Sequence, residues 1–280
     1  MCAIITTGRS RMSYWDYWER GPQTWWDKYP ASHGKRQSPI DIPSNGTKQI
    51  IMKELEIKYK PMKLRQIVEN VGYSWKLCLE GSAAHLQVWG GPLKAVFTLD
   101  HIHCHWGENH ELGNGSEHAV DGKKYEGELH FSHINNKYGS LSKAMDHEDG
   151  VGVLAVFLKV GTKANPELTK ILEGLKHCEF RGKSFVLEDK VDIVKLIPQS
   201  SFYFVYQGSL ARPPCIECVV WIVFKDPIEI SQSQLDALNE LQNHRRRQEG
   251  IKISNNYRPL CERGSREILL VKVPKKGCPC

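Results

Sequence analysis

The sequence of 280 residues lacks long apolar runs, low-complexity tracts, internal repeats and any linker-like shift in composition. Since a membrane-spanning helix needs about 20 consecutive apolar residues, we expect no membrane span. Residues 1–12 contain no continuous apolar stretch, so we also expect no secretory signal. We predict one domain over residues 13–274, preceded by a disordered extension (1–12) and followed by a short tail (275–280).

A disulfide framework is also missing, because the nine cysteines are odd in number. Cys215 and Cys218 form a CxxC motif, but no second pair completes a zinc-binding or redox motif. We therefore predict reduced thiols and a cytoplasmic protein. The net charge of +6 comes partly from short basic clusters such as residues 245–247. A solvated surface explains these clusters better than nucleic-acid binding, so we expect no nucleic-acid partner and a monomer.

What the chain does contain is a series of strand-like segments and few helical ones. Two nearly continuous apolar runs, Val151–Val160 and Val219–Phe224, are typical of strands buried on both faces in a wide sheet. Helical periodicity is limited to residues 166–177 and 231–244. The fold class is therefore predicted to be mainly β, with short helices on the surface. The other predicted strands are Leu55–Tyr59, Tyr73–Leu79, Leu86–Trp89, Ala95–His105 and Tyr125–His133.

Histidines recur at strand spacing in two segments. His103 and His105 are two residues apart, so in a strand their imidazoles lie on the same face. A neighbouring strand that carries His130 could supply a third nitrogen. Three protein ligands and one open position are typical of catalytic Zn²⁺. The alternative is that these are ordinary hydrogen-bonded residues, because the chain has 12 histidines and an isolated HxH motif is weak evidence.

Many short motifs occur together in one fixed order. They are Gln37-Ser-Pro-Ile-Asp-Ile42, Gly90-Gly-Pro92, His103-x-His105-Trp-Gly107, Gly115-Ser-Glu-His-x-Val-Asp121, Glu128-Leu-His130, Asn136-Lys-Tyr138, Asp149-Gly150, Val156-Phe-Leu-Lys159, Gly208-Ser-Leu210, Pro213-Pro214, Trp221-Ile222 and Asn256-Tyr-Arg-Pro259. Through them the chain resembles the α-class carbonic anhydrases from Trp15 to Val273. The segments around Tyr73 and Ile102 resemble the cytosolic invertebrate branch. The resemblance implies a large, twisted, mostly antiparallel sheet, with zinc at the floor of a conical cleft and CO₂ and bicarbonate as the substrates.

The resemblance also assigns the metal site. The family's zinc ligands fall on His103, His105 and His130. His101 occupies a position that usually holds a glutamine bonded to the first ligand, and a neutral imidazole could accept the same N–H. Glu128 stands where the family orients its third ligand, and Asn256 is expected to support the ligands as well.

Three cleft positions depart from the family pattern. Tyr73 replaces the histidine that exports protons in the most efficient members, so we expect slower proton export or a residue that only forms the wall. Ala211 replaces a threonine whose hydroxyl orients the nucleophile and donates to the carboxylate at Glu117. Losing one such preorganised group typically costs about 10²–10³-fold in rate. Arg212 adds bulk and positive charge where a small or apolar side chain is usual.

The apolar wall for CO₂ is largely retained. The resemblance assigns substrate contacts to Ser132, Val153, Leu210, Ala211, Arg212 and Trp221. Ser132 replaces a usual valine. We therefore predict zinc-dependent reversible hydration of CO₂ to bicarbonate, attenuated by Ala211 and Arg212. The alternative is a weakly active or inactive carbonic-anhydrase-related protein that acts as a binding module.

Overall fold

The structure, a computed structural model, describes residues 15–108 and 113–273. The predicted N-terminal extension (1–12) and the tail (275–280) lie outside the described residues. Within the described residues the protein is mainly β, as predicted, with one sheet of 13 strands and a separate two-stranded sheet.

The strands of the large sheet agree closely with the predicted segments. They are β2 (Lys48–Ile51), β3 (Leu55–Tyr59), β4 (Arg65–Asn70), β5 (Trp75–Glu80), β6 (Leu86–Gly90), β7 (Leu93–Trp106), β9 (Gly127–Asn135), β10 (Val151–Gly161), β11 (Ser184–Val186), β12 (Phe202–Gly208), β13 (Val219–Phe224), β14 (Ile228–Ser231) and β15 (Leu269–Lys272). The two-stranded sheet pairs β1 (Asp41–Ile42) with β8 (Ala119–Val120). All seven predicted strands exist, and the missed ones are mostly short or lie toward the sheet edges.

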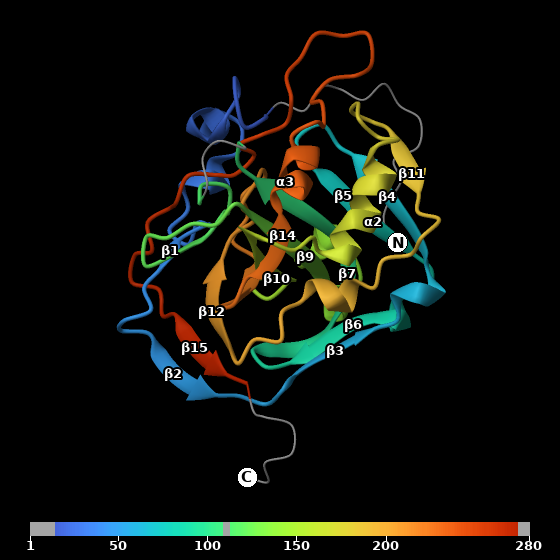
Figure 1. The fold of residues 1–280 in the computed structure, drawn as a ribbon. Coiled ribbons are helices and arrows are strands. Elements are labelled where there is room, and N and C mark those ends of the chain that lie inside the picture. Colours follow the sequence, from blue (N-terminus) through green and yellow to red (C-terminus); the bar gives the residue numbers. More distant parts are fainter. Residues whose placement is uncertain (1–14, 109–112, 274–280) are drawn as a thin grey trace.

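The order of the strands places the two apolar runs in the middle of the sheet. It runs β11-β4-β5-β7-β9-β10-β13-β12-β15-β2, with β3, β6 and β14 attached beside it. Most neighbours are antiparallel, but β10 pairs with β13 in parallel. Figure 1 shows β2 and β15 at one edge and β4 and β11 toward the other. The prediction that β10 and β13 are buried central strands is confirmed.

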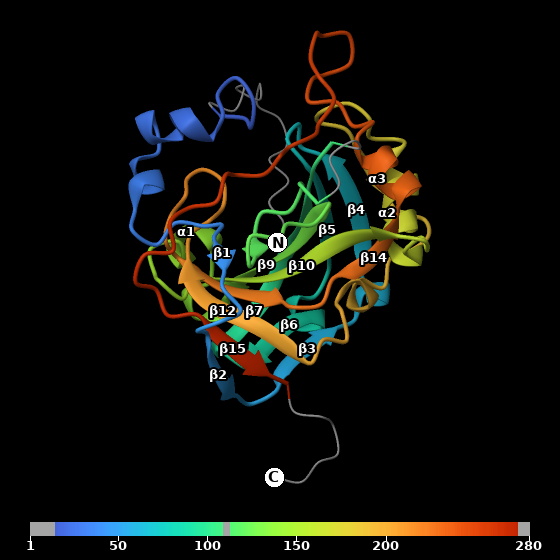
Figure 2. The same ribbon diagram turned by 60° about the vertical axis from the view of Figure 1, so that its left-hand side comes forward.

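The helices are few and short. They are α1 (Leu141–Ala144), α2 (Pro166–Leu175) and α3 (Gln232–Leu238), with 3₁₀ turns at Pro22–Asp27, Pro30–His33, Pro61–Lys63, Ala83–His85, Asn136–Tyr138 and Ile193–Leu196. Helices α2 and α3 lie side by side on the outside of the sheet (Figures 1 and 2). No helix of the described residues is long and apolar enough to cross a bilayer.

The predicted helix over residues 231–244 is wrong in length. A capping box of Ser231 and Gln234 begins α3 as expected. The helix ends at Leu238, because Asn239 follows as its C-cap and uses its side-chain amide to donate to the carbonyls of Gly107 and Leu235. The apolar residues that give this segment its helical periodicity, Leu235, Leu238 and Leu241, are nevertheless buried, although Leu241 lies beyond the helix end.

Successive side chains of β7, β9 and β10 point alternately to the two faces of the sheet. Ile102, Cys104 and Trp106 of β7 point into the larger apolar core, together with Leu129 and Phe131 of β9. The intervening residues therefore point to the opposite face. That face carries a second apolar cluster from β10, β12 and β13, and it also carries the histidines.

The aromatic N-terminal segment packs against the domain. Trp15, Tyr17 and Trp25 are buried in a cluster with Cys215, and the ring of Trp15 lies 4.7 Å from that of Tyr73. In Figure 2 this segment, drawn in dark blue, lies to one side of the sheet. Its burial positions Tyr17 and Tyr73 near the histidine-bearing face.

Candidate metal centre

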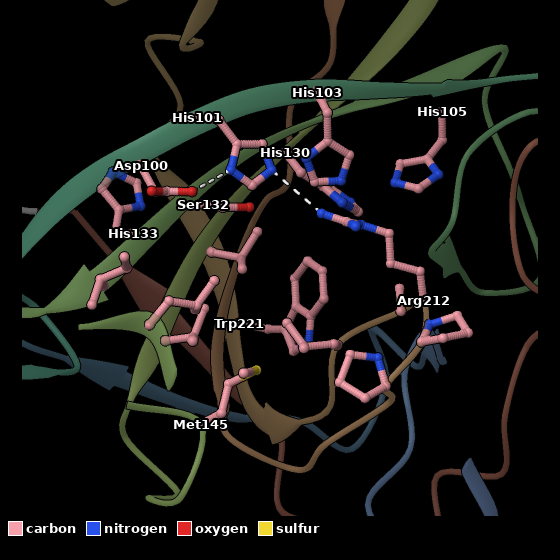
Figure 3. A pocket seen from close by; sticks show the side chains of 18 residues that line it. Asp100, His101, His103, His105, His130, Ser132, His133, Met145, Arg212 and Trp221 are labelled. Carbon is pink, nitrogen blue, oxygen red and sulfur yellow. Dashed lines mark hydrogen bonds and ion pairs between the residues drawn. The ribbon is translucent and has the colours of Figure 1, made fainter. Parts of the chain in front are cut away.

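Two neighbouring strands bring the three histidines together. His103 and His105 are two residues apart on β7, so their side chains lie on the same face. His130 of β9 lies directly across from His103 in the antiparallel register. The three side chains are buried, and their candidate ligand nitrogens all lie within 4.8 Å of one another. Figure 3 shows the imidazoles converging at one end of a cavity. The geometry expected of a three-nitrogen metal site is therefore present.

Hydrogen bonds on the outer side of two rings fix which nitrogen is available. His105 Nδ1 lies 2.7 Å from the Asn256 carbonyl oxygen and 3.0 Å from Glu117 Oε1. Because both neighbours are acceptors, Nδ1 carries the proton, and Nε2 keeps a lone pair without a hydrogen-bond partner. His130 Nε2 lies 2.7 Å from Glu128 Oε1, which leaves its Nδ1 available. Both rings are held in the tautomer that a metal requires.

Burial favours the neutral form of two of these imidazoles. It lowers the pKa of His130 to about 4, although Glu128 acts in the opposite direction. Burial, followed by the neighbouring imidazoles, lowers the pKa of His103 well below its ordinary value. Burial alone would raise the pKa of Glu128, but His118 and His130 outweigh it and the net pKa lies well below the ordinary value. Neutral imidazoles beside an ionised carboxylate are the protonation states that metal binding needs.

A buried polar chain that the sequence analysis missed extends from Glu128. His118 Nδ1 lies 2.7 Å from Glu128 Oε1, and its backbone N–H donates to Oε2 at 2.8 Å. His118 Nε2 lies 2.6 Å from the Tyr206 hydroxyl, which in turn donates to Ser38 Oγ at 2.9 Å. The motif that contains His118 was noted, but its partners come from distant strands. This chain fixes the carboxylate that orients His130.

The expected hydrogen bond between His101 and His103 is not formed. His101 Nδ1 lies 2.7 Å from Asp100 Oδ2, and its Nε2 faces Arg212 Nη2 at 3.5 Å. Both ring nitrogens of His101 are therefore engaged elsewhere, and His103 Nδ1 is buried without a partner. The rings of His101 and His103 are stacked instead, with centroids 5.1 Å apart.

One row of residues across four strands forms the wall beside the histidines. The register aligns His101 of β7 with Ser132 of β9, Val153 of β10 and Trp221 of β13. The cavity has a volume of about 210 Å³. It is lined by the six residues predicted to contact substrate (Ser132, Val153, Leu210, Ala211, Arg212 and Trp221), by the four histidines His101, His103, His105 and His130, and also by Asp100, His133, Ile134, Leu141, Met145, Val151, Pro213 and Pro214.

Behind this lining lies a carboxylate with one unsatisfied oxygen. Glu117 is fully buried, and its Oε1 accepts from the Arg258 backbone N–H at 3.2 Å. Its Oε2 has no hydrogen-bond partner, and residue 211, an alanine, has no side-chain donor. A buried acceptor without a donor typically costs about 1–3 kcal/mol. Glu117 Oε2 is therefore a local defect that no donor of the described residues satisfies.

Tyr73 is not a free phenol. Its hydroxyl accepts a hydrogen bond from Arg212 Nη1 at 3.0 Å, and the Arg212 guanidinium lies 5.5 Å from the ring centroid. Burial would raise the pKa of Tyr73, but the positive charges of Arg212, Lys76 and Arg181 outweigh it, so the pKa is lowered from its ordinary value. Arg212 thus joins the Tyr73 position to the histidine cluster.

The fold and the site define a mainly β protein in which three buried histidines that could hold a metal ion lie at a largely apolar cavity. The chain belongs to the eukaryotic-type carbonic anhydrase family, whose sequence model matches residues 20–272. Carbonic anhydrase 1 of Mus musculus is 39% identical over 248 residues, which cover 88% of this chain and 93% of that protein. Carbonic anhydrase 1 of Monodelphis domestica is 38% identical over 247 residues, covering 87% and 92%. The predicted family is confirmed; the invertebrate branch stays a prediction.

A titratable residue in the cavity wall gives a prediction for stability. His133 donates from Nδ1 to the Gly152 carbonyl at 3.1 Å, and its Nε2 contacts the Tyr59 hydroxyl. Burial lowers its pKa to about 4, against about 6.5 in an unfolded chain. As the pH falls, the unfolded state therefore binds a proton at His133 before the folded state does. Keeping His133 neutral in the folded state thus lowers the unfolding free energy progressively between about pH 6.5 and pH 4. We expect a loss of about 2 kcal/mol between pH 7 and 5 from this group.

Urea unfolding of the metal-free protein at pH 7 and pH 5 measures this loss. The matched variant is His133→Gln, which keeps a polar side chain but cannot titrate. Its unfolding free energy should fall by about 2 kcal/mol less over the same interval. Equal pH dependence in the two proteins would contradict the prediction.

Proposed function

We propose that the protein catalyses the zinc-dependent, reversible hydration of CO₂ to bicarbonate and a proton, at a rate below that of the most efficient family members. Membership of the carbonic anhydrase family supports this reaction in general. The observation that carries the proposal for this chain is the complete set of three buried imidazoles within 4.8 Å of one another. We further propose a catalytic domain over residues 13–274, a monomeric state and a cytoplasmic location. The even spread of the family motifs supports the domain, and the cysteines of the described residues, which form no disulfide, support the location.

The donor set fits zinc. Three imidazole nitrogens would hold the ion and would leave one coordination position for water, as in catalytic rather than structural zinc sites. When bound, zinc lowers the pKa of a coordinated water to about 7, a property established for this family. His103, His105 and His130 would hold the ion. Glu128 and the Asn256 carbonyl hold two of these rings in the ligating tautomer.

The apolar wall provides a place for CO₂, which has no net dipole. Val153, Leu210 and Trp221 line the cavity beside the histidines, and Ser132 adds a single hydroxyl to this wall. The indole of Trp221 lies 4.9 Å from the ring of His130. An apolar surface at this distance would hold CO₂ close to the metal position without strong binding.

Two substitutions support the attenuation. The family resemblance places the donor to Glu117 Oε2 at residue 211, which is alanine here, and this oxygen has no hydrogen-bond partner. Arg212 reaches across the cavity to His101 and Tyr73 and occupies part of the space beside the ligands (Figure 3). Proton export through Tyr73 would depend on a phenol that accepts a hydrogen bond from a cation. Each of these three features is expected to slow turnover, and none of them removes a ligand.

The position of Arg212 also favours a second candidate function. A guanidinium directed at the histidine cluster could block substrate, and the protein would then be a carbonic-anhydrase-related binding module. The intact ligand set argues against this alternative. A binding module could also retain zinc, so metal content alone does not separate the two candidates.

Stopped-flow CO₂ hydration separates the two candidates. The enzyme proposal expects zinc-loaded protein to hydrate CO₂ well above the metal-free protein, and the rate should return when zinc is restored after chelation. A rate for the zinc-loaded protein equal to that of the metal-free protein would reject the enzyme and leave the binding module.

A further inference from the structure

The cavity beside the histidines contains one permanent cation without an anionic partner. Arg212 is the only arginine or lysine among its lining residues, and among the described residues it forms no ion pair. The only carboxylate in the lining is Asp100, which is paired with His101 Nδ1 at 2.7 Å. Because an arginine side chain stays protonated in proteins, the Arg212 end of the cavity carries a positive charge that no carboxylate contacts directly. Asp100 faces this charge only across the neutral imidazole of His101.

The contacts of Arg212 leave most of its donors available. Nη1 donates to the Tyr73 hydroxyl at 3.0 Å, and Nη2 lies 3.5 Å from His101 Nε2. Both partners are neutral, so they orient the guanidinium without cancelling its charge. The guanidinium carries five N–H donors in a planar fork that matches the two oxygens of a carboxylate. The geometry is therefore preorganised for an anion that presents two oxygens.

The rest of the cavity is suited to an apolar group. Its lining away from Arg212 includes Leu141, Met145, Val151, Val153, Leu210 and Trp221. Figure 3 shows Arg212 directed toward the imidazoles, while Met145 lies on the opposite side of the cavity. The volume of about 210 Å³ is enough for a molecule of a few carbon atoms. A second negative charge would be desolvated against this apolar wall, which disfavours multiply charged anions.

We infer that this cavity is a binding site for small organic monocarboxylates with an apolar body. The carboxylate lies on the Arg212 guanidinium, and the hydrocarbon part packs against Val153 and Leu210. This inference goes beyond the proposed CO₂ chemistry and does not depend on it, because the site is formed by Arg212 and the apolar wall without a metal. Each additional buried CH₂ group is expected to tighten binding about fourfold.

An NMR titration of the metal-free protein tests the site directly. The probes are butyrate, acetate and the neutral amide butyramide, followed through the Arg212 Nε–H and Trp221 indole N–H signals. Butyrate should bind saturably and more tightly than acetate, while butyramide should bind at least about tenfold more weakly than butyrate, because charge-assisted hydrogen bonds are lost. Equal affinity for butyrate and butyramide would overturn the inference.

Variants separate Arg212 from the general positive charge of the protein. Arg212→Gln should weaken butyrate binding by about 10–100-fold, and Arg212→Lys should give an intermediate affinity because it keeps the charge without the planar fork. Arg181→Gln is the matched control, because Arg181 lies outside the cavity lining and its loss should change the affinity by less than twofold. Unchanged butyrate affinity in Arg212→Gln, or in Arg212→Lys if the first variant does not fold, would overturn the inference.

The same samples distinguish failure of this site from failure of the proposed function. Zinc-loaded protein that binds butyrate through Arg212 but does not hydrate CO₂ would reject the enzyme and support the carboxylate site. If zinc-loaded protein hydrates CO₂ but Arg212→Gln binds butyrate as well as the natural chain does, the enzyme is supported and the carboxylate site is rejected.

Discussion

His103→Ala is expected to lose stoichiometric zinc and, with it, CO₂ hydration above the level of the metal-free protein. Loss of a group that only orients a ligand typically lowers metal affinity about 10–100-fold, and removal of a ligand itself should cost more. His103 Nδ1 makes no hydrogen bond, so the side chain contributes little polar stabilisation to the surrounding fold. The variant should therefore fold, and the loss should be specific to the metal.

Metal analysis after exhaustive dialysis, combined with stopped-flow CO₂ hydration, measures both effects. His133→Ala is the matched control, because His133 is also a buried histidine of β9 that lines the cavity, but it does not belong to the three-histidine group. That variant should retain one zinc per chain. Stoichiometric zinc in His103→Ala would show that the ligand set is wrong.

The histidine pair on β7 could be predicted from the sequence alone because the strand period is two. The third ligand could not be placed in this way. His130 lies opposite His103 only because of the register of β7 with β9, and that register shifts between Leu99 and His101. Spacing along the chain does not report such an irregularity, so the pattern made His130 a candidate and the family resemblance assigned it as the third ligand.

The contacts that the sequence does not predict depend on how the chain folds around Arg212. The sequence allows His101 to accept from His103, but Asp100 and Arg212 face its two ring nitrogens instead. The sequence also does not show that Arg212, 139 positions away, donates to the Tyr73 hydroxyl. A long, flexible arginine can reach several acceptors, and its choice depends on tertiary packing that a linear pattern does not contain.

Ala211→Thr is expected to raise the rate of CO₂ hydration by tenfold or more. The structure contains the acceptor that such a hydroxyl needs, because Glu117 Oε2 is buried and has no partner. A threonine hydroxyl that donates to this oxygen would have its own lone pair available to orient the nucleophile. One preorganised group of this kind is typically worth about 10²–10³-fold. The expected gain is set lower because Arg212 still occupies part of the cavity.

The matched control is Ala211→Val, which has the shape of threonine without the hydroxyl. If the hydroxyl is responsible, Thr should raise kcat/KM for CO₂ while Val leaves it unchanged or lowers it by filling the cavity. The metal-free proteins provide a second readout: Thr should gain about 1 kcal/mol of unfolding free energy over Val, because only Thr satisfies the buried carboxylate oxygen. Equal rates for the two variants would show that the alanine is not the limiting defect.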